Sequence, residues 1–485
     1  MAEYSKYKNL AVNTVLFALN SVATKLVTFM LVPLYTAYMT AGEYGLTDMS
    51  LTVINLVTPL VTLDVADAAV RFIVSDRARS DMYTTVSIGV TIVSIAIVAV
   101  FAPLLDLPAF GGLGNYKVWF IAAYAASALL NLCGEVTRGM GRVKIIPICA
   151  SASSVVTLTT AVLTIGWARM GVSGYFISVV VGPVIGISLY IWLGGLGDAI
   201  VRGFRQLGSL TKEGVWSLVR PMMRYALPLI PNSLFWWLSS GINRLYITSA
   251  LGISASGMFA AASKVPNLLN TVYSIFLQAW QLSAFQESGE TGLEHFFSRV
   301  FAFVQAGMTI LCATLSFLAP WVAAVLLRGE TYEAWPMIAP LLLSNLFNVL
   351  ASFYGTVYST TMRTSFIMWT TVLGSLSCVV LTPLFLPVMG TYGVCVASML
   401  GQGAVFLARA VDSRRYLRFN VGWRFLVPTL LLLVIQAAVT EMTPMWWREA
   451  SLACLVGVVA IQGARVLCVL CSTGGVAGLP GRGRD

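Results

Sequence analysis

Among the cations that lie inside long apolar segments of the chain are Lys25, Arg244 and Lys264. A charged side chain within a membrane is costly and usually faces a cavity or a functional partner. Ammonium and guanidinium groups are natural partners of phosphate and diphosphate groups. These residues therefore predict a binding site for a compact anion. For Lys25 the alternative is that its side chain snorkels to the membrane surface.

Polar residues accompany these cations at helical spacing. Lys25 shares a helix face with Ser21 and Thr28. Arg244 shares one with Ser233, Trp237 and Ser240. We expect both cations to point into one cavity, at depths that differ by roughly 10 Å. Lys264 begins a third polar face, which contains Asn267, Ser274 and Gln278.

Two carboxylates and an arginine end the second apolar segment. Asp64, Asp67 and Arg71 follow one another at spacings of three and four. An i,i+4 ion pair between Asp67 and Arg71 explains the pattern as well as a functional role does. An ion-coupled transporter needs an intramembrane carboxylate, and Asp64 and Asp67 are the only candidates we identify for coupling to H⁺ or Na⁺. His295, the single histidine, lies in a polar loop and is assigned no proton-relay role.

The composition excludes a soluble fold. Of 485 residues, 58% are hydrophobic and 10% are charged, where a soluble domain carries about 25% charged residues. The cations are scattered between apolar runs, which argues against a nucleic-acid partner. The eight cysteines lie in apolar segments, and we interpret even the Cys468 and Cys471 pair as small apolar side chains. We therefore expect no metal, cofactor or catalytic site.

Apolar segments long enough to span a bilayer recur along the whole chain. The sequence predicts an all-α integral membrane protein of about fourteen transmembrane helices. The predicted segments are residues 10–39, 46–72, 83–105, 118–137, 145–168, 172–196, 225–251, 255–284, 298–327, 334–361, 364–388, 391–411, 425–441 and 445–471. With both termini in the cytoplasm, 23 Lys and Arg residues, Arg465 among them, lie on the inner side and four on the outer side. This bias is what the positive-inside rule requires.

The two halves of the chain match each other. An offset of 212 residues pairs Gly45 with Gly257, and an offset of 219 pairs Gly171 with Gly390. Chance similarity between apolar sequences is the alternative, but the shared register favours two parallel six-helix repeats followed by two more helices. The predicted parts are an N-terminal lobe, a basic amphipathic cytoplasmic linker, a C-terminal lobe, two added helices and a disordered tail, over residues 1–196, 197–224, 225–411, 412–471 and 472–485.

Several short runs also resemble one family. The run N-S-V-A-T-K-L-V-T-F-M-L-V-P-L-Y-T from Asn20, G-E-Y-G from Gly42, A-A-V-R-F from Ala68 and P-L-I-P-N from Pro228 are similar to bacterial polysaccharide flippases of the multidrug/oligosaccharidyl-lipid/polysaccharide exporter superfamily. The resemblance implies a two-lobed bundle that flips a polyprenyl-diphosphate-linked oligosaccharide across the cytoplasmic membrane by alternating access. It assigns Lys25 and Arg71 to the diphosphate, whereas Arg244 and Lys264 rest on the spacing argument.

Two other functions compete with this one. An ion-coupled drug antiporter of the same fold would use Asp64 or Asp67. A membrane enzyme is disfavoured because the predicted outer loops, such as residues 106–117, are too short to build an active site. The expected partners are the lipid-linked glycan, membrane lipid, H⁺ or Na⁺, and the polysaccharide polymerase machinery.

Overall fold

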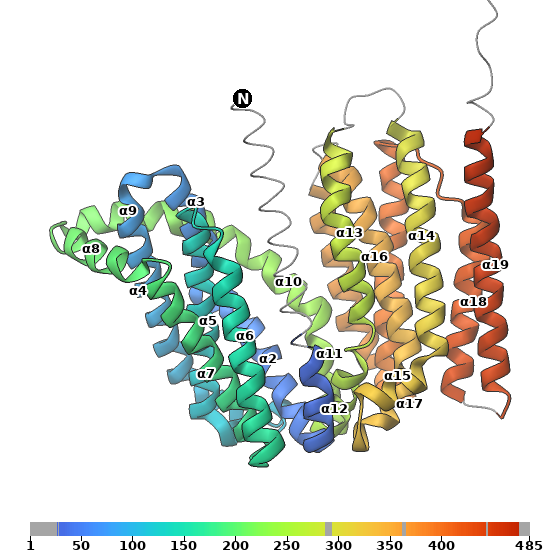
Figure 1. The fold of residues 1–485 in the computed structure, drawn as a ribbon, viewed down its shortest axis with the longest axis horizontal. Coiled ribbons are helices and arrows are strands. Elements are labelled where there is room, and N and C mark those ends of the chain that lie inside the picture. Colours follow the sequence, from blue (N-terminus) through green and yellow to red (C-terminus); the bar gives the residue numbers. More distant parts are fainter. Residues whose placement is uncertain (1–26, 28, 287–292, 361–364, 443–444, 475–485) are drawn as a thin grey trace, which may run out of the picture. The chain divides into compact units, whose positions relative to one another are not determined.

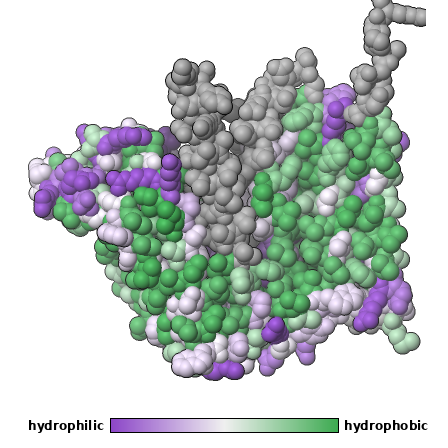
Figure 2. Space-filling view, viewed as in Figure 1, coloured by the Kyte–Doolittle hydropathy of each residue, from purple (hydrophilic) through white to green (hydrophobic). Residues whose placement is uncertain are grey.

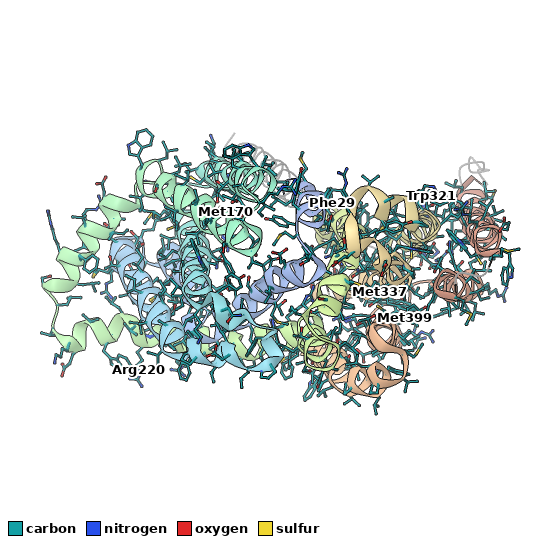
Figure 3. All side chains as sticks on the ribbon, turned by 90° about the horizontal axis from the view of Figure 1, so that it is seen from below. Phe29, Met170, Arg220, Trp321, Met337 and Met399 are labelled. Atoms are coloured by element: carbon teal, nitrogen blue, oxygen red, sulfur yellow. The ribbon has the colours of Figure 1, made fainter. Side chains whose placement is uncertain are left out.

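The computed structural model describes residues 27, 29–286, 293–360, 365–442 and 445–474. All regular secondary structure within these residues is helical, which confirms the predicted all-α class (Figure 1). Contacts divide the chain into two compact units, residues 1–260 with 328–331, and residues 261–327 with 332–485. Side chains fill the spaces between the helices of each unit (Figure 3). The division differs from the predicted lobe boundary, because the segment after the linker packs on the first unit.

The first unit contains most of the helices before residue 262. They are α2 (Ala41–Thr62), α3 (Val65–Ser75), α4 (Ser80–Phe101), α5 (Lys117–Gly139), α6 (Ile145–Ala161), the π-helical turn η5 (Val162–Trp167), α7 (Gly171–Trp192), α8 (Leu196–Gly208), α9 (Lys212–Ala226), α10 (Ile230–Ser240), α11 (Ile242–Leu251) and α12 (Ile253–Ala262), which reaches the boundary between the units. Preceding α2 is the short helix Phe29–Tyr38. Thr40 and Glu43 form a capping box that fixes where α2 begins.

The predicted helix over residues 46–72 is broken in the structure. Leu63 and Asp64 both have positive φ, 55° and 49°, and separate α2 from α3. Near this break the hydroxyls of Thr58 and Thr62 donate to carbonyls one turn earlier, each at 2.7 Å. Such back-bonding weakens a helix and often bends it.

The linker forms two amphipathic helices, α8 and α9. Arg202 of α8 pairs with Asp81 of α4, with 2.7 Å between Nε and Oδ2. Thr211 caps α9 by accepting from the N–H of Gly214. Figure 2 shows hydrophilic surface over these helices and hydrophobic surface over much of the rest.

The second unit contains the later helices. They are α13 (Asn267–Gln286), α14 (Leu293–Phe317), α15 (Ala319–Leu326), the 3₁₀ segment η7 (Gly329–Met337), whose first residues belong to the first unit, α16 (Ile338–Thr360), α17 (Ser365–Asp412), α18 (Trp423–Met442) and α19 (Trp447–Gly474). Gly390, with φ 59° and ψ −143°, breaks α17 into two helices, as the predicted segments 364–388 and 391–411 require. The last helix extends three residues into the predicted tail, whose remainder, residues 475–485, lies outside the described residues.

The described residues include ten helices long and apolar enough to cross a membrane, one of which is the broken α17. The other predicted segments contain the shorter helices Phe29–Tyr38, α10, α11 and α12. They also contain α13, which has 20 residues but is not among the ten. The chain is therefore a multi-pass membrane protein, and fourteen crossings stays a prediction.

A contact between α2 and α12 supports the 212-residue repeat. A Cβ atom on Gly45 would collide with the carbonyl oxygen of Ile253, and one on Gly257 would collide with that of Ala41. The same added atoms would lie 3.1 Å from Gly257 N and 2.9 Å from Gly45 N, respectively. Since Ile253 lies 212 residues after Ala41, the contact is reciprocal in the predicted register.

Candidate functional site

The polar face predicted around Arg244 lies against α2. On α10, Ser233 Oγ donates to Asp64 Oδ2 at 3.2 Å, and Trp237 Nε1 donates to the carbonyl of Thr52 at 2.8 Å. One turn beyond the end of α10, Arg244 Nε donates to Asp48 Oδ2. Polar contacts with α2 and with Asp64, just beyond its end, therefore run along α10 and α11.

The ion pair between Asp48 and Arg244 is largely buried. Their side chains are 8% and 17% exposed, and Arg244 Cζ lies 5.9 Å from the ring centre of Phe259. Arg244 thus has a counter-ion in this structure. Only Asp64 and Asp67 were named as candidate carboxylates for ion coupling, but Asp48 also lies inside the predicted segment 46–72. Its position there was a signal that the sequence already contained.

A pocket of about 600 Å³ opens beside the Asp64–Ser233 hydrogen bond. Residues of α2, α5 and α10 line it: Asn55, Thr58, Pro59, Asp64, Ser127, Asn131, Ser233, Trp236 and Trp237. Trp237 is buried, whereas the indole of Trp236 is 57% exposed. Amides and hydroxyls supply both donors and acceptors, and indole supplies a flat apolar face with a polar edge. The pocket therefore offers hydrogen-bond donors and acceptors, one carboxylate and an aromatic face.

Arg71 contacts an aromatic ring and not Asp67. Its Cζ lies 4.7 Å from the ring centre of Tyr225 in α9, a distance typical of a cation–π contact. Asp67 and Arg71 are both exposed, and across the described parts of the chain no ion pair joins them. The helix-end ion pair suggested by their spacing is therefore not formed.

The predicted polar face around Lys264 belongs to the second unit. Lys264 is half-buried in a turn over residues 263–266, which interrupts the predicted helix 255–284. The interruption ends at Pro266, which has no N–H to continue a helix. Asn267 is exposed at the start of α13, and Ser274 donates to the carbonyl of Thr271 at 2.8 Å.

The structure does not describe the side chains of the other predicted site residues. Residues Lys25, Ser21 and Thr28 are not among the described ones, and Ser240 and Gln278 lie in helices but their side chains are not described. Their roles stay predictions. Across the described ranges, no group of three or more His, Cys, Asp or Glu side chains could hold a metal ion.

Comparisons with known proteins agree with this architecture. A family described as "Polysaccharide biosynthesis protein" matches residues 10–281, more than half of the chain. No curated protein sequence matches significantly.

Solved structures extend the likeness to almost the whole chain. The lipid II flippase MurJ in an inward closed conformation is 14% identical with a TM-score of 0.67, over 93% of this chain and 98% of that one. An inward-facing multidrug resistance MATE transporter of the MOP superfamily is 13% identical with a TM-score of 0.67, over 82% and 97%. A MOP superfamily transporter from Pyrococcus furiosus is 14% identical with a TM-score of 0.56, over 83% and 95%. The predicted family is confirmed: this chain belongs to the polysaccharide biosynthesis protein family and has the fold of the MurJ and MATE transporters.

Proposed function

We propose that this protein flips a polyprenyl-diphosphate-linked oligosaccharide across the bacterial cytoplasmic membrane by alternating access. The product would serve cell-surface polysaccharide synthesis, O-antigen for example. The observation that carries the proposal is the polar pocket with an exposed indole, lined by α2, α5 and α10 together with Asp64. Such a lining accommodates sugars, which bring many hydroxyl groups and have apolar ring faces.

Arg244 and Asp48 would respond to the diphosphate of the same substrate. Removing either charge alone from a buried pair leaves an uncompensated ion, which is strongly unfavourable. A diphosphate can instead join the Asp48 carboxylate on the guanidinium, which has five N–H donors. Neither Asp48 nor Arg244 then loses its charged partner. Phosphate also accepts two parallel N–H bonds from a guanidinium. Lys25 would be the second cation to hold the diphosphate.

An ion-coupled antiporter is the second candidate. It is favoured by the carboxylate of Asp64, which lines the pocket and accepts from Ser233. Asp48 adds a second carboxylate to the same unit. In such a transporter, binding of H⁺ or Na⁺ at Asp64 would alternate with binding of an apolar cation or drug.

A reconstituted system can distinguish flipping of a lipid-linked glycan from ion-coupled antiport. Proteoliposomes would contain the purified protein and a fluorescent polyprenyl-diphosphate oligosaccharide, and an impermeant glycosidase would report how much glycan reaches the outer leaflet. Flipping should be fast for the wild type, weak for Arg244→Gln and Lys25→Met, and partial for Arg244→Lys. Arg448→Gln is the matched control, because Arg448 is exposed on α19 and contacts the rings of Trp321 and Trp447. Absence of wild-type flipping, together with cation uptake driven by an H⁺ or Na⁺ gradient, would favour the antiporter.

A further inference from the structure

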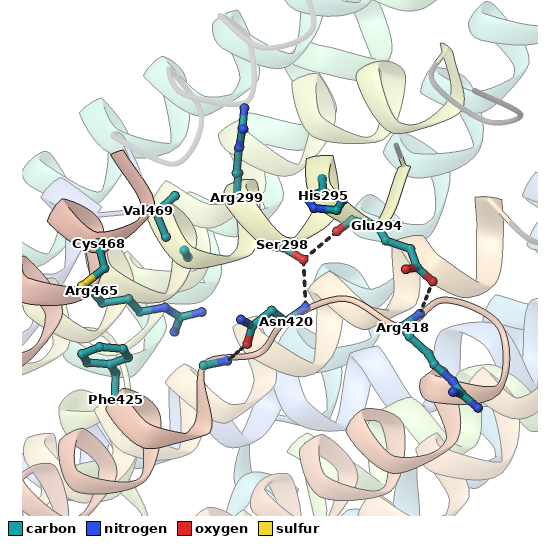
Figure 4. A pocket seen from close by; sticks show the side chains of 12 residues that line it. Glu294, His295, Ser298, Arg299, Arg418, Asn420, Phe425, Arg465, Cys468 and Val469 are labelled. Carbon is teal, nitrogen blue, oxygen red and sulfur yellow. Dashed lines mark hydrogen bonds between the residues drawn. The ribbon is translucent and has the colours of Figure 1, made fainter. Parts of the chain in front are cut away.

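A second cavity, of about 570 Å³, lies in the second unit, apart from the pocket described above. It is formed by the first turns of α14, the loop before α18 and the last turns of α19 (Figure 4). The Lys/Arg distribution predicts that these helix ends face the cytoplasm. No step of the proposed transport uses this cavity.

One arginine in the cavity is buried without a counter-ion. Arg465 is 3% exposed, and Figure 4 shows its side chain reaching from α19 into the cavity beside Phe425. Its Nη1 atom is buried and has no hydrogen-bond partner, and none of the carboxylates in the described ranges pairs with it. A buried, unsatisfied guanidinium group is unfavourable, so the site is incomplete without an anion.

The surrounding residues fix the position of the guanidinium. Arg465 Cζ lies 5.9 Å from the ring centre of Phe301, and on another side it meets Gly422. Gly422 has φ +67°, and a Cβ atom there would lie 2.7 Å from Arg465 Cζ. Only glycine suits both the backbone conformation and this close approach.

The loop that bears Gly422 is itself tied to α14. The N–H of Asn420 donates to Ser298 Oγ at 2.8 Å, and the N–H of Arg418 donates to Glu294 Oε1 at 3.2 Å. Asn420 Oδ1 in turn accepts from the N–H of Gly422 at 2.9 Å. Hydrogen bonds therefore hold in place the loop that packs against Arg465.

Two further arginines, Arg299 and Arg418, stand at the rim. Both are exposed, and in Figure 4 their side chains point away from the middle of the cavity. Glu294 is the single carboxylate in the lining, and it already accepts a backbone N–H. Positive charge therefore dominates the cavity, with one fixed cation inside and two exposed cations at the opening.

We propose that this cavity binds the headgroup of an anionic phospholipid, with Arg465 Nη1 donating to a phosphate oxygen. Basic pockets between transmembrane helices at the cytoplasmic surface are typical sites for such headgroups. A lipid fits better than free phosphate because apolar side chains continue from the cavity along α18 and α19, where acyl chains can lie. Examples on the membrane side of Arg465 are Val456 and Val459, 60% and 44% exposed, and Val427 and Leu431, 46% and 58% exposed.

The exposed thiol of Cys468 lines the cavity and provides a reporter. Cys471, the other exposed cysteine, would be replaced by Ser, and Cys468 alkylation by N-ethylmaleimide would be timed in substrate-free nanodiscs. We expect alkylation to be several-fold slower in phosphatidylglycerol than in phosphatidylcholine. Arg465→Gln should remove this difference, and Arg465→Lys should retain part of it. Arg448→Gln, at the opposite end of the same helix, should leave it unchanged.

Three further alkylation experiments distinguish a phospholipid from other ligands. Inorganic phosphate added to phosphatidylcholine nanodiscs should protect Cys468 little, and equal protection would overturn the lipid assignment. Oleate, an anionic lipid without phosphate, should protect Cys468 less than phosphatidylglycerol does. Equal protection would mean that the cavity attracts any negative charge and does not recognise phosphate. Gly422→Ala should mimic Arg465→Gln by displacing the guanidinium. Protection that persists in both variants would overturn the proposal. Because alkylation needs no transport, this result is independent of the flippase proposal.

Discussion

Asp48 of α2 and Arg244 of α11 form an ion pair whose side chains are only 8% and 17% exposed. Charges removed from water to this extent interact strongly and depend on each other for solvation. An exposed pair in the same unit, Asp106 with Lys117, has exposures of 58% and 35% and a separation of 2.5 Å. The two pairs permit a matched comparison.

Asp48→Asn should lower the free energy of unfolding by about 3–5 kcal/mol, because it leaves a buried guanidinium without its counter-ion. Combining Asp48→Asn with Arg244→Gln should cost much less than the sum of the single changes. Asp106→Asn should cost at most about 1 kcal/mol. Thermal and denaturant unfolding of the purified variants measures all four values. Additive effects at positions 48 and 244 would contradict a buried pair.

The two adjacent tryptophans of α10 should respond differently to replacement. Trp237→Ala removes a buried ring that donates to Thr52 and covers Gly241, and should cost about 3–5 kcal/mol of stability. Trp236→Ala removes an exposed ring and should change stability by about 0.5 kcal/mol or less, yet reduce glycan flipping. The measurements are unfolding and the glycosidase assay, normalised to inserted protein. Wild-type flipping by Trp236→Ala would remove the indole from the proposed substrate path.

Gly390→Ala should destabilise the protein through its backbone alone. No atom lies within 4 Å of a Cβ placed there, but φ is +59° and ψ is −143°, a combination that costs other residues about 1–3 kcal/mol. Gly307→Ala is the control, because Gly307 lies inside α14 and an added Cβ also meets nothing. Gly307→Ala should stabilise the protein by about 0.5–1 kcal/mol. The measurement is the free energy of unfolding of each variant. Changes of the same sign in the two variants would contradict this explanation.

Residues 251–257, which join α11 to α12 and include the first turn of α12, should face the outside of the cell. Ser254 is exposed and Ser256 is 2% exposed, so Ser254→Cys should react with an impermeant thiol reagent in intact cells and Ser256→Cys should not. The background should lack the exposed cysteines Cys468 and Cys471, which the orientation places at the cytoplasmic side. Reaction of Ser254→Cys only after permeabilisation would reverse the predicted topology.

The helices were largely predictable from the sequence, because a bilayer-spanning segment is recognised from local composition and length. Two segments meeting at Gly390 could be separated because glycine marks the break. The break at Leu63 and Asp64 was missed, since leucine rarely has positive φ and a single aspartate, although it tolerates that conformation better, is a weak signal. Similarly, α10 and α11 were predicted as one helix with the end of α9.

The candidate site was less predictable, because its contacts join residues distant in the chain. Spacing placed Ser233, Trp237 and Arg244 on one face but could not show that α2 covers that face. The Lys/Arg tally counted Arg465 on the cytoplasmic side, although the residue lies within the predicted segment 445–471. The structure instead buries it inside α19, where one loop residue, Gly422, completes its surroundings.

The reciprocal packing of Gly45 and Gly257 makes this part of the chain equivalent to a homodimer interface that has been fused into one polypeptide. In an isologous interface each residue occurs twice, so any substitution alters both sides. Fusion removes that constraint. In the 212-residue register, Asp48 and Arg244 correspond to Ala260 and Val32, which are 0% and 4% exposed and apolar. The glycine contact has kept its twofold character, while the ion pair exists on one side only, an asymmetry that two identical chains could not have acquired.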